Sequence, residues 1–276
     1  MSLRRVVFFL ALTLLSGWRL TVAEPPHPVW GLQRILAQKK LVVALVDTDY
    51  PPLFITSKTG RLQGSDISLV QDMARELGVK VEFVRKTHSF NEIIDIVSRG
   101  EADIGLATSI TLLRAQKVQF TQPYLTLKIA LLLNRLKLIE HGLASELKAL
   151  AELRHTTQPI GVLTGSSYAV YARKHFPQAT VKEYPLLPEL LAAVQRGDLL
   201  AAVRNDLTAK LYLHRHPEAI LRLQLFVDQN TQDYVAFPVH RDRPHLLTWL
   251  NAYLLLKNVQ WNSSDLVEQY KRLPPR

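Results

Sequence analysis

Hydrophobic positions in the first half of the chain form two kinds of pattern, short apolar runs typical of buried strands and the spacing of amphipathic helices. They predict three strands with two helices between them, in the order strand 41–46, helix 67–77, strand 79–84, helix 90–99 and strand 102–106. Gly78 and Gly100 directly follow the two helices, where glycine commonly ends a helix. Ser89 and Glu92 have the spacing of a capping box at the start of the second helix.

The second half of the chain repeats this order of elements. The predicted elements are strand 160–163, helix 167–175, strand 180–184, helix 187–196 and strand 199–203. In both halves the last helix ends at Arg-Gly before a buried strand, a junction common enough to arise twice by chance. Two such units predict two mainly parallel sheets, each flanked by helices, in an α/β fold.

Beyond the second unit, the pattern predicts a strand over 223–227, a polar turn from Asp228, a strand over 234–238 and a helical tail over 245–272. We expect the tail to pack on the first unit, so that two strands cross between two lobes near 124–128 and 232–236. The predicted organisation is a lead-in over 24–38, a first lobe formed by 39–126 and 233–276, and a second lobe over 127–232.

The N-terminus has the features of a secretory signal peptide over residues 1–23. Arg4 and Arg5 precede an apolar run over 6–15, and Ala23 ends a stretch of small residues at the expected cleavage site. A retained membrane anchor is the alternative, but the run is shorter than the roughly 20 residues that a spanning helix needs. We therefore expect secretion, with no stable membrane insertion after cleavage.

Composition narrows the classes of function. The chain has 276 residues, of which 47% are hydrophobic and 21% charged, as in ordinary globular proteins of one large or two medium domains. Its formal net charge is +10, or +7 once the three arginines of the signal peptide are removed. The basic residues are scattered, so we expect no nucleic-acid partner. The absence of cysteine excludes disulfides, thiolate metal sites and thiol catalysis.

No enzyme motif stands out. The histidines form neither HExxH nor a compact ligand cluster, and GxGxxG, Walker and GxSxG motifs are absent. We therefore predict no metal, no cofactor and no catalytic residue. A paired-carboxylate site among Asp47, Asp49 and Asp66 remains open, although nothing in the pattern specifies one.

The loops after the first unit's strands carry candidate ligand-binding residues, because ligands of open α/β sheets bind outside the carboxyl ends of the strands. Asp47 and Tyr50 follow the first strand, in a loop that two prolines hold extended. Phe90 begins the helix after the second strand, where it could equally be a core residue. Ser109 and Arg114 follow the third strand, and the arginine could bind a carboxylate through two parallel hydrogen bonds.

The second unit offers complementary groups at its own strand ends. Ser167 begins a helix whose free N–H groups favour an anion, although a plain N-cap role explains a serine there as well. Asp206 follows the last strand and could either cap the next helix or bind an ammonium group. Arg114 for a carboxylate and Asp206 for an ammonium, one from each lobe, together predict a site for the head group of an amino acid.

From about residue 40 to 270, the chain resembles the bacterial extracellular solute-binding proteins of family 3, the periplasmic receptors of polar amino acid ABC transporters. The segments that carry the resemblance are LVVALVDTDYPPLF, GRLQGSDISLVQDMARELGVKVEFV, GEADIGLATSITLLRAQKVQFTQPYL, IGVLTGSSYAVYARKHF and RGDLLAAVRNDLTAKLYL. By position, it implies that Tyr50 and Phe90 form aromatic walls, Arg114 with Ser109 and Ser167 binds the α-carboxylate, and Asp206 binds the ammonium. Asp47 and Asp66 match acids that contact cationic side chains in some relatives.

The resemblance implies the type II periplasmic-binding-protein fold, with two lobes joined by two crossing strands. It also implies capture of a ligand by hinge closure, a periplasmic monomer and ABC transporter permeases as partners. The chain has Thr111-Leu112-Leu113-Arg114 where the family often has Thr-Pro-Glu-Arg. It also has one residue fewer than the family usually has between Asp103 and the arginine, which shifts backbone N–H groups and leaves the ligand class open. The alternatives are an accessory or sensory binding subunit and an enzyme similar to cyclohexadienyl dehydratase.

Overall fold

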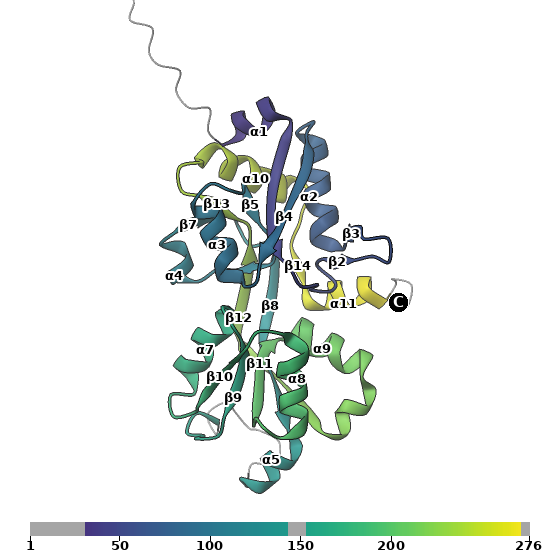
Figure 1. The fold of residues 1–276 in the computed structure, drawn as a ribbon, viewed down its shortest axis with the longest axis vertical. Coiled ribbons are helices and arrows are strands. Elements are labelled where there is room, and N and C mark those ends of the chain that lie inside the picture. Colours follow the sequence, from purple (N-terminus) through teal and green to yellow (C-terminus); the bar gives the residue numbers. More distant parts are fainter. Residues whose placement is uncertain (1–30, 143–152, 272–276) are drawn as a thin grey trace, which may run out of the picture.

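The computed structural model describes residues 31–142 and 153–271, so the predicted signal peptide lies outside the described residues. Two lobes, each containing a sheet flanked by helices, are joined by two long strands, β8 (Leu125–Asn134) and β12 (Leu223–Ala236) (Figure 1). These strands pair antiparallel, with Gln232 opposite Lys128 and Val235 opposite Leu125. The crossing strands expected near 124–128 and 232–236 are thus direct neighbours.

The first lobe is built on a five-stranded sheet in the order β4-β1-β5-β13-β7. Its strands are β1 (Lys40–Val46), β4 (Lys80–Thr87), β5 (Ile104–Gly105), β7 (Val118–Phe120) and β13 (Pro238–His240). Strand β1 is parallel to β4 and β5, whereas β13 runs antiparallel to β5 and β7. The sheet is therefore parallel except where the returning chain adds β13.

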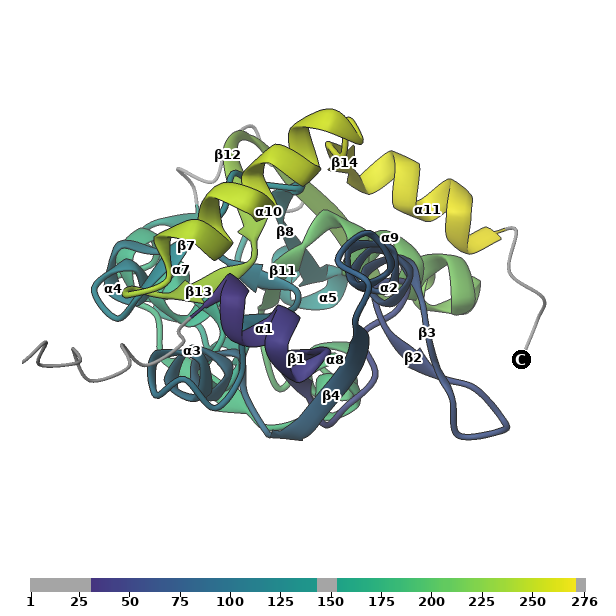
Figure 2. The same ribbon diagram turned by 90° about the horizontal axis from the view of Figure 1, so that it is seen from above.

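Helices cover both faces of this sheet. They are α1 (Leu32–Gln38), α2 (Ser65–Glu76), α3 (Phe90–Ser98), α4 (Leu112–Ala115) and α10 (Pro244–Leu256). Seen from above, α3 lies on one side of the sheet and α2 and α10 on the other (Figure 2). A short hairpin, β2 (Ile55–Thr56) with β3 (Leu62–Gln63), extends from this lobe. At the start of α3, Ser89 Oγ accepts the Glu92 N–H, which confirms the predicted helix start.

The second lobe contains the sheet to which both crossing strands belong, in the order β10-β9-β11-β8-β12-β6, with β14 paired to β8. Besides β8 and β12, the strands of this sheet are β6 (Thr108–Ser109), β9 (Ile160–Leu163), β10 (Val181–Tyr184), β11 (Ala201–Asn205) and β14 (Trp261–Asn262). Of these, β6 and β14 pair with the ends of the crossing strands that adjoin the first lobe. Strands β10, β9 and β11 are parallel, and β8 is antiparallel to β11. The helical elements of this lobe and the C-terminal helix are α5 (Arg135–Glu140), α7 (Ser167–His175), α8 (Leu187–Arg196), α9 (Asp206–Arg215), the 3₁₀ helix η1 (Pro217–Leu221) and α11 (Ser263–Lys271).

The structure corrects two expectations for the C-terminal part. The segments 223–227 and 234–238 were expected as separate strands around a turn, but β12 runs through both, with a bulge between Val227 and Gln232. The carboxylate of Asp228 accepts the Thr231 hydroxyl and the Asn230 N–H, so the polar residues form a local bulge and pairing with β8 resumes beyond it.

The tail expected as one helix over 245–272 is two helices, α10 and α11. The helix is interrupted after Leu256, and the interruption contains Asn258, which has a positive φ of 50°. Asn262 then accepts the N–H groups of Ser264 and Asp265 through its side chain, which favours a new helix start over continuation of the first helix.

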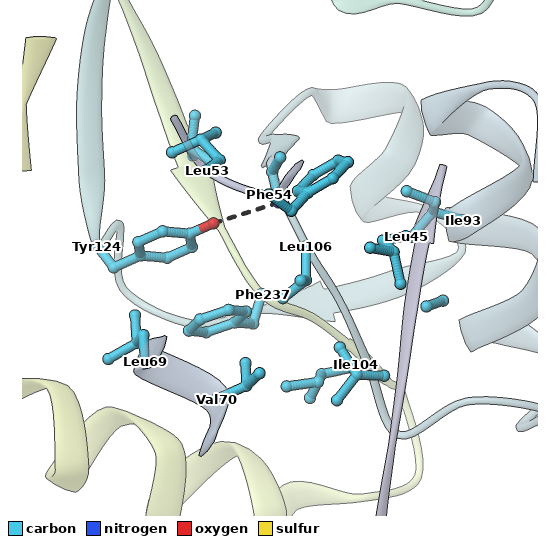
Figure 3. Close-up of a cluster of buried hydrophobic side chains, with 14 of the residues drawn as sticks. Leu45, Leu53, Phe54, Leu69, Val70, Ile93, Ile104, Leu106, Tyr124 and Phe237 are labelled. Carbon is cyan, nitrogen blue, oxygen red and sulfur yellow. Dashed lines mark hydrogen bonds between the residues drawn. The ribbon is translucent and has the colours of Figure 1, made fainter. Parts of the chain in front are cut away.

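The core of the first lobe anchors both crossing strands. Tyr124, next to the start of β8, stacks on Phe237, next to the end of β12, with ring centroids 4.4 Å apart. Figure 3 shows the two rings side by side among buried aliphatic side chains such as Leu69, Val70 and Leu106. Both rings are fully buried, so each crossing strand is fixed where it enters the first lobe.

Candidate ligand-binding site

A small cavity of about 10 Å³, which we call the inter-lobe cavity, lies where the two lobes meet at the crossing strands. Five of the seven predicted site residues line it: Tyr50, Phe90, Ser109, Arg114 and Ser167. The remaining walls are formed by Leu53, Ala107, Leu127, Ser166, Tyr168, Asn205, Asp233 and Val235. This volume is about what one water molecule requires, so the inter-lobe cavity has no room for a larger molecule.

Arg114 is the central cation of the cavity. Thr111 caps the short helix α4 by accepting the Arg114 N–H through its hydroxyl, which orients the arginine towards the cavity. Its guanidinium donates from Nε to Asn91 Oδ1 at 3.1 Å, from Nη1 to the Ser109 carbonyl at 2.9 Å and from Nη2 to the Gly165 carbonyl at 3.1 Å. Gly165 belongs to the second lobe, so this buried arginine binds both lobes at once.

Burial lowers the pKa of Arg114 to about 10, and the negative charge of Asp233 opposes that shift. The guanidinium therefore remains positively charged at neutral pH. A buried, charged guanidinium is suited to bind a carboxylate through parallel hydrogen bonds. The carboxylate would take the place of the carbonyl groups that now accept these bonds.

Tyr50 forms the aromatic wall of the first lobe. Its ring meets Phe90 edge to face, with centroids 5.6 Å apart, and its backbone N–H donates to the Phe54 carbonyl at 2.8 Å. The Tyr50 hydroxyl accepts Asn205 Nδ2 of the second lobe at 2.7 Å. Tyr50 thus forms part of the cavity wall and also links the two lobes through this hydrogen bond.

The second lobe closes the cavity with α7 and the end of β11. Ser167, the first residue of α7, donates its hydroxyl to Ser109 Oγ at 3.1 Å. Asn205 ends β11, donates to the hydroxyls of Tyr50 and Tyr168, and caps α9 by accepting the Thr208 N–H at 2.8 Å. Hydroxyl and amide groups therefore span the interface between the lobes.

Asp233 is the carboxylate of the cavity, and the sequence analysis did not identify it. It lies on β12, is buried, and accepts the Tyr168 hydroxyl. Burial raises the pKa of Asp233, while hydrogen bonds from Tyr168 and Ser109 and the charge of Arg114 oppose the rise. Its position in the expected crossing segment 232–236 was the available signal, because an acid on a strand between two lobes faces their interface.

Arg204 is a second arginine that the sequence analysis did not identify. It is fully buried near the end of β11, where its guanidinium carbon lies 5.8 Å from the ring centre of Tyr50 and 5.2 Å from that of Tyr168. Both rings line the inter-lobe cavity. The site therefore contains two buried cations beside aromatic rings.

Asp206, expected to bind an ammonium group, does not line the cavity. Its buried carboxylate accepts the Lys128 N–H at 3.0 Å, the Lys210 ammonium at 2.7 Å and the Ser263 hydroxyl. These contacts tie α9 to β8 and α11. Asn205 is the last residue of β11 and lines the cavity, whereas Asp206 is the first residue of α9 and its carboxylate faces β8 and α11.

Asp47 and Asp66 also lie outside the cavity lining. The Asp47 carboxylate is 2.6 Å from His88 Nδ1 on a partly exposed surface. Asp66 is fully buried behind the cavity, where it accepts the Tyr124 hydroxyl at 2.7 Å. Burial raises the pKa of Asp66 to about 7, against the lowering effect of that hydrogen bond.

Within residues 31–142 and 153–271, no group of three or more His, Cys, Asp or Glu side chains could hold a metal ion. Over the same two ranges, no helix is both long and apolar enough to cross a membrane.

The chain belongs to the bacterial extracellular solute-binding proteins, family 3, because the model of that family matches residues 42–260. It is similar to a probable histidine-binding protein of Neisseria gonorrhoeae, with 21% identity over 68% of this chain and 67% of that protein. It is also 30% identical to the probable ABC transporter extracellular-binding protein YckB of Bacillus subtilis (strain 168), over 43% of this chain. That second match spans only 40% of the Bacillus protein.

Solved structures show the same fold. The ancestral amino acid-binding protein AncCDT-1, described as a precursor of cyclohexadienyl dehydratase, is 26% identical with a TM-score of 0.69, over 87% of this chain and 98% of that one. A putative ABC transporter binding component from Wolinella succinogenes DSM 1740, complexed with lysine, is 21% identical with a TM-score of 0.70, over 84% and 96% of the two chains. The two-lobe type II periplasmic-binding-protein fold is therefore that of this chain.

Gly165 should control how closely the lobes approach. Its φ is +65°, and a Cβ added there would lie 2.7 Å from the Ser89 Cβ of the first lobe. We expect Gly165→Ala to hold the lobes further apart and to increase the radius of gyration measured by small-angle X-ray scattering. Gly60→Ala is the matched control, because Gly60 has φ +76° with no atom within 4 Å of an added Cβ. Equal radii for Gly165→Ala and the wild type would contradict this role.

Asp66 should make stability depend on pH. Its folded-state pKa of about 7 lies above the ordinary value of 3.8, so the folded protein holds a proton that the unfolded chain releases. The contribution of Asp66 to the free energy of unfolding is therefore full below about pH 4 and falls as the pH rises towards 7, by roughly 4 kcal/mol at most. Urea unfolding at pH 4.5 and 7.5 should show Asp66→Asn gaining stability relative to the wild type at the higher pH. A difference that stays constant between the two pH values would be inconsistent with this assignment.

Proposed function

We propose that this protein captures a small solute carrying a carboxylate, in the first place an amino acid, between its two lobes. The observation that carries the proposal is Arg114, a buried guanidinium that donates to acceptors of both lobes inside the inter-lobe cavity. Membership of the solute-binding family supports it, as do relatives whose names refer to histidine and arginine binding.

Capture requires the lobes to separate and close again. An amino acid cannot fit in about 10 Å³, so the contacts of Gly165 with Arg114 and of Asn205 with Tyr50 must break to admit it. The ligand carboxylate would then replace the carbonyls of Gly165 and Ser109 as acceptors of the Arg114 donors. Since both lobes contact the bound molecule, ligand binding favours the closed arrangement over the separated one.

The strands β8 and β12 provide the hinge in this mechanism, and we assign residues 39–126 with 233–276 to one lobe and 127–232 to the other. We further propose export to the periplasm through the signal peptide 1–23, function as a monomer, and delivery of the ligand to the permease subunits of an ABC transporter. The match to a probable ABC transporter extracellular-binding protein supports the transport role. In this role the protein acts as a receptor and not as an enzyme.

One observation favours a second candidate function. Asp233 is a buried carboxyl with a raised pKa beside Arg114, which is the arrangement that an acid-catalysed elimination from a bound carboxylic acid would use. The similarity to a precursor of cyclohexadienyl dehydratase gives the reaction to test. Turnover of a cyclohexadienyl acid that disappears in Asp233→Asn would establish this enzyme function, whereas no turnover leaves the receptor role.

Arg114→Ala should weaken ligand binding without unfolding the protein. We expect a thermal-shift screen of residues 24–276 against the common amino acids to find a ligand that raises the melting temperature, because that ligand binds only the native state. Loss of charge-assisted hydrogen bonds should weaken its binding by roughly tenfold to a hundredfold in Arg114→Ala. Arg173→Ala, at an exposed arginine paired with Glu183, should keep the wild-type shift. An Arg114→Ala protein with the full ligand-dependent shift would refute the proposed role.

A further inference from the structure

Arg204 is a buried cation with unused hydrogen-bond donors. Its side chain is fully buried, and its Nε and Nη1 atoms have no acceptor within the described parts of the chain. Its Nη2 has only distant partners, the Tyr50 hydroxyl at 3.4 Å and Thr208 Oγ1 at 3.5 Å. Buried charged donors are normally satisfied, because leaving them without acceptors is costly.

The guanidinium lies where two cavities approach each other. It packs against Tyr50 and Tyr168 of the inter-lobe cavity, and Tyr50 also lines a second cavity of about 80 Å³. Thr208, the other neighbour of Arg204 Nη2, lines that second cavity as well. Tyr50 is thus the partition between the cavities, and a shift of its side chain on lobe separation would expose Arg204 to a ligand held by Arg114.

The ionisable side chains around the site carry more positive than negative charge. Asp233 interacts electrostatically with both Arg114 and Arg204, and among the described residues it is the one carboxylate lining the inter-lobe cavity. Two guanidinium groups and one carboxylate leave a net charge of +1. A zwitterionic or cationic amino acid would leave this excess uncompensated, whereas a ligand of net charge −1 would neutralise it.

The two orphaned donors and this charge balance point to the same ligand class. We propose that Arg204 is a second anion-binding residue and that the ligand carries two acidic groups, as in an α-amino dicarboxylate. In this arrangement Arg114 binds one carboxylate, Arg204 binds the second and Asp233 binds the ammonium group. The proposal rests on the proposed function, and it narrows the ligand to a class that differs from the histidine and arginine in the names of two relatives.

A purely structural Arg204 would behave differently. If the side chain only packed between the rings, an apolar replacement of similar length would keep the protein folded, with its buried charge removed. Such a change would not alter which ligands are preferred. The ratio of affinities for a dicarboxylate and its monoamide therefore separates a ligand-binding role from a packing role.

The test compares L-glutamate with L-glutamine, and L-aspartate with L-asparagine, by calorimetric titration of residues 24–276. Succinate joins the panel as a dicarboxylate without an ammonium group, and L-arginine and L-histidine as cationic ligands. We expect the wild type to bind at least one acidic amino acid roughly tenfold to a hundredfold more tightly than its amide. In Arg204→Met the ratio of the two affinities should fall to about one. Arg173→Met, at an exposed arginine of the same lobe, is the control and should keep the preference.

Each outcome of this titration supports or contradicts a specific part of the proposal. Succinate binding as tightly as the amino acids would support two anion sites but remove the ammonium role of Asp233. Binding of L-arginine, L-histidine or an amide in preference to the acids would overturn the assignment of Arg204 and leave the proposed function standing. No binding by any of these compounds would overturn the assignment of Arg204, and the proposed function would then be decided by the thermal-shift screen against all the common amino acids. The wild-type comparison keeps the proposal testable even if Arg204→Met fails to fold.

Discussion

The antiparallel pairing of β8 with β12 is the interaction on which the rest of the structure depends. It joins the lobes, and it also supplies three walls of the inter-lobe cavity: Leu127, Asp233 and Val235. Tyr124 and Phe237 fix the two strands in the core of the first lobe, while Asp206 holds β8 against α9 and α11 by accepting the Lys128 N–H. Strands β8 and β12 therefore form both the proposed hinge between the lobes and part of the wall of the inter-lobe cavity.

The lobes meet through polar groups that satisfy one another. Arg114 donates to Gly165, Ser167 to Ser109 and Asn205 to Tyr50, so closure leaves few buried donors without acceptors. A ligand must replace these contacts with stronger ones. A carboxylate can do so, because its hydrogen bonds to the Arg114 guanidinium are charge-assisted, whereas the present acceptors are neutral carbonyls. Among the described residues that line or adjoin the inter-lobe cavity, Arg204 keeps buried donors without acceptors, and our proposal for the ligand rests on these donors.

The sequence was sufficient to predict the α/β units, the crossing strands and five cavity residues, because periodicity marks strands and helices and ligands bind at strand ends. The prediction of the site residues failed where a shift of one position along the chain decides which side chain lines the cavity. Asn205 and not Asp206 faces the cavity, because Asn205 ends β11 while Asp206 already belongs to α9 and turns towards β8 and α11. Asp233 lies at the end of a polar run typical of a turn, and Arg204 directly follows an apolar run. Their roles come from tertiary pairing, which the local pattern does not contain.

The most direct test of capture between the lobes is a distance measured across them. The chain has no cysteine, so Lys117→Cys in the first lobe and Arg173→Cys in the second can each carry a single spin label at an exposed position. Pulsed electron paramagnetic resonance would give the distance distribution with and without a saturating mixture of the common amino acids. The account predicts that the mixture shortens and narrows the distribution and that Arg114→Ala abolishes the change. A distribution that stays the same while an amino acid demonstrably binds would contradict it.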